Sequence, residues 1–159
     1  MGWVASKGKA QAVWDVPKDL KREWFEAATR GSSDDLKKIV ERRPDIVNLI
    51  DDKGETGLFK VAREGHREAV QTLVGSLRAT TDLSTRDGFT PLMISSCRGD
   101  VEVSKLLLDA RASVNVKDKE GRSALTYAVG QGHAEMVALL IANRAKVHEP
   151  TGSGHTPLM

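Results

Sequence analysis

The chain repeats itself with a period of roughly 33 residues, and this period constrains its fold more than any other feature of the sequence. The tetrapeptides TGLF, TPLM, SALT and TPLM begin at almost equal intervals, at Thr56, Thr90, Ser123 and Thr156. Glycines keep the same intervals, two residues before each tetrapeptide (Gly54, Gly88, Gly121 and Gly154) and nine residues after the start of three of them (Gly65, Gly99 and Gly132). This agreement between independent features indicates tandem copies of one structural unit.

The third copy shows how one unit is built. Ser123 is a helix-capping residue and predicts a helix through Val129, which Gly132 ends because glycine takes a positive φ at little cost. A second helix is expected from about Ala134 to Asn143, with a wide apolar face. Between units, a polar stretch containing glycine, such as KDKEGR at 117–122, predicts a tight turn or β-finger. Two such short helices cannot bury their apolar faces alone, so neighbouring units must stack.

This pattern resembles the ankyrin repeat, which has the same period of about 33 residues and the motif T-P-L-H-x-A. The best single match is DGFTPLMISSCRGDVEVSKLLLDARASVNVKD at 87–118. The resemblance implies an all-α, right-handed and slightly curved helix-turn-helix solenoid with short β-turn fingers, whose inner helices and fingers form a concave face. The expected organisation is a flexible leader, a degenerate first repeat, three full repeats and a truncated repeat, at 1–17, 18–50, 51–84, 85–117, 118–150 and 151–159.

The chain departs from the ankyrin pattern at several positions. The motif histidine is replaced by Phe59, Met93, Thr126 and Met159. The motif proline is replaced by Gly57 and Ala124, which we expect to loosen the first turn of the inner helix because proline there has its φ already set. The first full unit has one extra residue, expected around Gly75–Thr81.

Arginine stands where the ankyrin pattern usually has a glycine after the second helix, at Arg111 and Arg144. If that backbone is left-handed, each arginine costs on the order of 1 kcal/mol relative to glycine. The two side chains are expected on one edge of the stack. One interpretation is that they form a small basic ladder for an acidic partner or phosphate. The other is that they are substitutions that the surface tolerates and that have no function.

The last five residues, HTPLM, have the sequence of the first turn of a further inner helix, with Pro157 at its favoured first position. We therefore expect the chain to be a fragment, a trimmed chain or an incomplete gene product. The outward apolar side of the third unit is expected to be only partly covered, which predicts weak end-to-end self-association.

No catalytic motif of the phosphate-loop, dinucleotide-binding or nucleophile-elbow type occurs in the chain. Cys97 is interpreted as a small, partly exposed residue, since a nucleophile needs an activated thiolate. His66 and His133 share one repeat position and are expected to make structural hydrogen bonds, whereas His148 and His155 lack other ligands at zinc spacing. The sequence thus predicts a protein that is not an enzyme and that holds no cofactor or metal.

Charge and composition narrow the partners and the compartment. The formal net charge is +2, too small to favour nucleic acid or stable membrane association. Gly2 and Ser6 fit a loose lipidation pattern, but the bulky Trp3 is unfavourable for it, so residues 1–17 are interpreted as a leader. A single cysteine and the lack of a secretory signal predict a cytoplasmic protein, with the nucleus also compatible.

The surface that remains is the concave face implied by the resemblance. The expected function is a non-catalytic protein–protein interaction scaffold. The alternative is a regulatory or targeting segment of a larger multidomain protein, such as an enzyme with its catalytic domain beyond Met159. Phe89 is the expected aromatic anchor, because buried aromatic side chains dominate interface energies. The full set of expected partner-binding residues is Asp52, Lys53, Glu55, Arg63, Glu64, Arg86, Asp87, Phe89, Arg98, Lys119, Glu120, Arg122 and Gln131.

Overall fold

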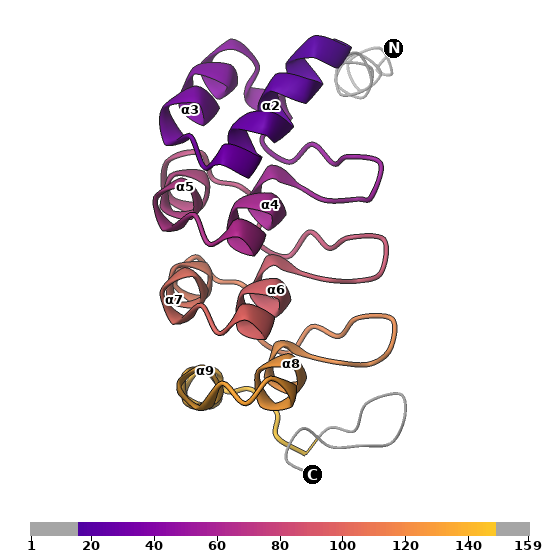
Figure 1. Ribbon diagram of the computed structural model, residues 1–159, viewed down its shortest axis with the longest axis vertical. Helices are drawn as coiled ribbons and strands as arrows, with labels where there is room; N and C mark the ends of the chain where they lie inside the picture. Colours follow the sequence, from indigo (N-terminus) through magenta and orange to yellow (C-terminus); the bar gives the residue numbers. More distant parts are fainter. Residues whose placement is uncertain (1–15, 149–159) are drawn as a thin grey trace, which may run out of the picture.

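The computed structural model describes residues 16–148, which form a stack of helical pairs in two columns (Figure 1). The inner column consists of α2 (Lys18–Arg30), α4 (Gly57–Glu64), α6 (Pro91–Arg98) and α8 (Ala124–Gly130). The outer column consists of α3 (Ser33–Arg42), α5 (Arg67–Gln71) with its continuation η2 (Thr72–Ser76), α7 (Val101–Asp109) and α9 (Ala134–Ala142). A short 3-10 helix, η1 (Pro44–Ile46), follows α3. The predicted all-α solenoid is confirmed, and its fingers project on one side of the inner column (Figure 1).

Each full repeat begins and ends its inner helix in the same way. The side-chain oxygens of Thr56, Thr90 and Ser123 accept hydrogen bonds from the backbone N–H three residues later, at 3.1, 3.3 and 3.4 Å. These bonds satisfy amide groups that would otherwise lack a partner in the first helical turn. The helix is followed by a glycine with a positive φ, at Gly65 (80°), Gly99 (70°) and Gly132 (74°).

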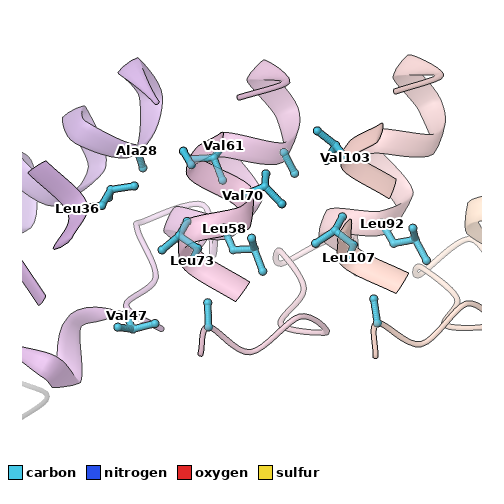
Figure 2. Close-up of a cluster of buried hydrophobic side chains, with 14 of the residues drawn as sticks. Ala28, Leu36, Val47, Leu58, Val61, Val70, Leu73, Leu92, Val103 and Leu107 are labelled. Atoms are coloured by element: carbon cyan, nitrogen blue, oxygen red, sulfur yellow. The ribbon is translucent and has the colours of Figure 1, made fainter. Parts of the chain in front are cut away.

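The core runs without a break from one repeat into the next. Figure 2 shows Leu58 and Leu73 of one repeat in the same places as Leu92 and Leu107 of the following repeat. All four side chains are buried. Because each helical pair contributes only one layer, burial of its apolar surface depends on the neighbouring pair, as expected for a repeat protein.

Gly57 has a packing reason in the structure. A Cβ at this position would lie 2.9 Å from the ring of Trp24, a fully buried side chain of the preceding inner helix. Neither proline nor alanine fits beside that ring without movement. Helix α4 still begins at Gly57, with the Thr56 cap in place.

The extra residue of the first full unit lies in η2, which is a π-helix at Thr72–Ser76. This wider turn overlaps the predicted range at its N-terminal end and adds one residue without moving the rest of the repeat. The backbone is left-handed at both arginines, with φ of 68° at Arg111 and 65° at Arg144, so the condition under which each costs more than glycine is met. A third arginine, Arg78, has the same conformation with φ of 54°.

Several predictions concern residues outside the range 16–148, namely the leader, its lipidation pattern and the HTPLM sequence. Among the described helices, none combines the length and the apolar character that crossing a membrane requires.

Candidate functional site

Each finger is organised by one side chain at a fixed repeat position. The Oδ1 atom of Asp51 accepts the N–H groups of Lys53 and Glu55, both at 2.9 Å. Asp118 makes the same pair of bonds in the third full repeat, with the N–H groups of Glu120 and Arg122. In the second full repeat the equivalent residue is Thr85, whose hydroxyl accepts a hydrogen bond from the N–H of Phe89 at 3.2 Å. The fingers are therefore held by internal hydrogen bonds, independently of any ligand.

Neighbouring fingers are also bonded to each other. The N–H of Arg86 donates to the carbonyl of Lys53 at 3.3 Å, and the N–H of Lys119 donates to the carbonyl of Asp87 at 3.1 Å. At Gly88 a Cβ would lie 2.9 Å from the backbone of Asp118 in the next finger. Because Gly88 has no side chain, the backbones of the two fingers can approach closely, and the fingers stack in one row.

The expected partner-binding residues lie on this row and at the C-terminal ends of the inner helices, whose N-terminal ends follow the fingers. Nine of them are exposed, namely Asp52, Lys53, Glu64, Arg86, Asp87, Arg98, Lys119, Glu120 and Gln131. Arg63, Phe89 and Arg122 are partly buried, and Glu55 is buried. One groove between the first two fingers brings part of the set together, and its lining is Asp52, Lys53, Glu55, Phe59, Thr85, Arg86, Asp87 and Phe89. The other seven expected residues lie outside that groove.

Glu55 belongs to a network of ion pairs below the first full finger. Lys60 Nζ lies 2.7 Å from Glu55 and 2.8 Å from Asp51, and Arg63 donates to Glu55 at 2.6 Å. Burial opposes the charge of Lys60, but its hydrogen bonds to Asp51 and Glu55 raise the pKa of Lys60 above its ordinary value. The carboxylate of Glu55 is thus already engaged with two cations within the protein.

Phe89, the expected anchor, packs against an aromatic neighbour. Its ring centroid lies 5.0 Å from that of Tyr127 in the next repeat, and the Arg122 guanidinium lies 5.1 Å above the Tyr127 ring. The Tyr127 hydroxyl and Arg122 Nε both donate to Asp118 Oδ2. Burial and the hydrogen bond to Asp118 raise the pKa of Tyr127 well above its ordinary range. Burial also opposes the charge of Asp118, but bonds from Tyr127 and Arg122 lower the pKa of Asp118 below its ordinary value.

The repeated histidines make the structural hydrogen bonds that the sequence predicts. His66 Nε2 lies 2.9 Å from the carbonyl of Thr29, and His133 Nε2 lies 3.0 Å from the carbonyl of Cys97, each in the preceding repeat. Within residues 16–148 no group of three or more histidine, cysteine, aspartate or glutamate side chains is arranged to hold a metal ion.

Sequence reasoning missed four residues that shape this face, namely Asp51, Lys60, Asp118 and Tyr127. Asp51 and Asp118 carried a usable signal, because each lies three residues before a finger glycine in the repeat register. Lys60 and Tyr127 carried none. Their repeat position holds Ile94 in the second full repeat, and their carboxylate partners lie in the finger of the same repeat, so no feature shared by all repeats marks them.

The repeat geometry and the sequence comparisons agree on the class of protein. The family model described as ankyrin repeats (3 copies) matches residues 24–118 and 105–159, and the chain belongs to the ankyrin-repeat family. It is 33% identical over 107 residues to ankyrin repeat-containing protein ITN1 of Arabidopsis thaliana, which covers 67% of this chain and 18% of that protein. It is 36% identical over 85 residues to ankyrin repeat and SAM domain-containing protein 6 of Mus musculus, which covers 54% of this chain and 10% of that protein. Ankyrin repeats are in general protein–protein interaction modules.

Proposed function

We propose that this chain is a non-catalytic scaffold that binds a protein partner through the concave face formed by the row of fingers and the inner helices. The observation that carries the proposal is that the fingers are held by two sets of hydrogen bonds. One set lies within each finger, and the other joins Arg86 to Lys53 and Lys119 to Asp87 in neighbouring fingers. A backbone fixed before binding loses less conformational entropy on association.

The chemistry of the row favours a polar partner surface with both signs of charge. Cations and anions alternate at the tips, as in Asp52 with Lys53, Arg86 with Asp87 and Lys119 with Glu120. Opposite charges placed at fixed spacing select register and partner more than they add affinity. The ring of Phe89 is already partly covered by Tyr127. We therefore expect Phe89 to contribute to partner binding as part of an apolar contact surface that it forms with Tyr127.

Pull-down after cross-linking in a lysate of the source cells tests this proposal. The variant carries Arg86→Ala, Asp87→Ala and Lys119→Ala, whose side chains are exposed at the fingertips. Only backbone atoms of these residues bond the fingers together, so the row is expected to stay intact.

The matched control removes two cations and one anion from the outer helix α3, with Lys37→Ala, Lys38→Ala and Glu41→Ala. A partner captured by the parent and the control but lost by the fingertip variant supports the scaffold. A partner retained by the fingertip variant places the interface elsewhere and contradicts the proposal.

A second candidate is a regulatory or targeting segment of a longer multidomain protein. It is favoured by the small share of the two relatives that this chain spans, 18% and 10% of their lengths. The sequence of the full-length transcript tests it. A catalytic domain encoded after Met159 would support this reading, and further repeats followed by a stop codon would support the scaffold alone. In both cases we propose a cytoplasmic or nuclear location, on the ground of the single cysteine.

A further inference from the structure

Three arginines occupy a backbone conformation that arginine does not favour. Arg78, Arg111 and Arg144 have φ of 54°, 68° and 65°, and each stands at the same repeat position, after the outer helix of its repeat. The left-handed region is costly for residues with a Cβ and cheap for glycine. Glycine would therefore be the least costly residue at all three positions, and yet the chain has the same large cationic side chain at each.

Hydrogen bonds hold the backbone on both sides of these arginines. The residue after each arginine donates its N–H back into the helix, from Ala79 to Leu73, from Ala112 to Leu107 and from Ala145 to Leu140. The next residue is bonded to the preceding repeat. Asn48 Oδ1 accepts the N–H of Thr80, Asp82 that of Ser113, and Asn115 that of Lys146, all at 2.9 Å. Each arginine thus projects from a fixed point, and only its side chain loses freedom on binding.

The extra residue of the first full repeat does not disturb this arrangement. The π-helix Thr72–Ser76 takes up the insertion before the chain reaches Arg78. Arg78 consequently keeps the left-handed conformation and the position after the outer helix that Arg111 and Arg144 have. Three equivalent positions in a stack of repeats lie along one line, parallel to the column of outer helices in Figure 1.

The three side chains are exposed, and within residues 16–148 no ion pair engages them. The carboxylate of Asp82 lies in the same loops, but it accepts both the N–H and the hydroxyl of Ser113. Asp109 is exposed beside Arg111, whereas the equivalent residues Ser76 and Ala142 carry no charge. The edge therefore presents one available guanidinium group per repeat.

We propose that Arg78, Arg111 and Arg144 form an arginine ladder that binds an extended acidic peptide segment of a partner protein, with one carboxylate per repeat. The planar guanidinium group matches a carboxylate with two parallel hydrogen bonds, which a lysine cannot do. A row of three charges at repeat spacing suits a linear chain. Membrane surfaces are typically recognised by clusters of about four to eight basic residues. This ladder is an interface separate from the row of fingers.

The test uses the full chain, a fluorescent poly-glutamate peptide and a poly-glutamine peptide of the same length. The parent is expected to bind only poly-glutamate, more weakly as salt is raised. Arg78→Gly, Arg111→Gly and Arg144→Gly together are expected to weaken binding about 30-fold, from about threefold for each exposed ion pair. The same variant is expected to unfold at a higher urea concentration, because glycine relieves the left-handed backbone. Loss of binding with gained stability cannot result from unfolding.

The matched control is Lys18→Gln, Lys37→Gln and Lys38→Gln, three exposed cations of α2 and α3 whose replacement changes the net charge by the same amount. It is expected to keep the parent's affinity. Equal binding by the glycine variant, equal loss in the control, or no binding of poly-glutamate by the parent would each overturn the proposal. Binding of the parent to phosphatidylserine vesicles but not to poly-glutamate would also overturn it, and would assign the ladder to a membrane surface instead.

Discussion

Asp118 shows how one residue fixes both a turn and the side chains around it. Its side chain is almost completely buried, yet the carboxylate accepts two backbone N–H groups, the Tyr127 hydroxyl and Arg122 Nε. A buried carboxylate is costly unless its oxygens are fully bonded, and here both of them are. In the second finger the equivalent position holds Thr85, whose hydroxyl makes the turn hydrogen bond and is not an ionisable carboxyl group.

Replacement of Asp118 by asparagine is expected to destabilise the protein by about 2 kcal/mol at pH 7, the typical contribution of hydrogen bonds to a charged group. The folded protein holds the pKa of Asp118 below its ordinary value, so this stabilisation is fully present above that ordinary value. It is lost as the pH falls through the lowered pKa. Urea unfolding at pH 7 and pH 3 measures the effect, and parent and variant should differ less at pH 3.

Asp87→Asn is the control for that experiment. Asp87 lies exposed at the tip of the second finger, where the expected change at either pH is close to zero. A difference between parent and Asp118→Asn that grew toward acid pH would contradict the assignment.

Whole elements are set by contacts between repeats as much as by their own sequence. Helix α4 begins with glycine where its counterpart α6 begins with Pro91, although proline has the better φ for that position. The reason lies one repeat away, in the Trp24 ring that packs against Gly57. Helix α5 likewise changes to the π-helix Thr72–Ser76 to keep the following loop in register.

Alanine at Gly57 is expected to destabilise the protein by about 1 to 3 kcal/mol, the usual cost of overpacking. Helix propensity alone predicts the opposite sign, a gain of up to about 1 kcal/mol. Thermal or urea unfolding of Gly57→Ala measures the change. In a Trp24→Phe background the cost should be smaller, because the atom nearest the new Cβ, Trp24 Cζ2, belongs to the outer ring of the indole, which phenylalanine lacks. Equal costs in both backgrounds would show that Trp24 is not the cause.

Deletion of Gly75 is expected to convert the π-helix into a regular α-helix and to leave the stack folded. A Cβ at Gly75 would meet nothing within 4 Å, so no packing is lost with this residue. Far-ultraviolet circular dichroism should be unchanged, and the midpoint of urea unfolding should stay the same or rise. Deletion of Leu106 from α7, which has no extra residue, is the control and should strongly destabilise the protein. A comparable loss in both deletions would contradict the placement of the insertion.

At the scale of the whole molecule, the sequence predicted the features that all repeats share, and it missed the side-chain contacts that occur in only one repeat. The period predicted the stacked helical pairs and the glycine turns, and it singled out Arg111 and Arg144 as positions where the ankyrin pattern usually has glycine. It could not predict Lys60 between Asp51 and Glu55, since that position differs in every full repeat. Asp51, Glu55 and Lys60 belong to one repeat, and no other full repeat has this combination of charges, so a pattern common to all repeats does not reveal it.

The last outer helix that the structure describes, α9, exposes a row of apolar side chains at Ala134, Ala138, Ile141 and Ala142, and Ile141 is 44% exposed. A large apolar side chain on such a face favours contact with another apolar surface, so we expect the protein to associate weakly with itself at high concentration. Sedimentation velocity over a range of concentrations measures this. Ile141→Lys should remove the concentration dependence and leave the free energy of unfolding within about 0.5 kcal/mol of the parent, as for other surface substitutions. Ile50→Lys, on an isoleucine that is 50% exposed at the end of the degenerate first repeat, is the control and should still associate. A parent that sediments as a monomer at every concentration would contradict the prediction. Equal association of the Ile141 variant would place the contact on a different surface.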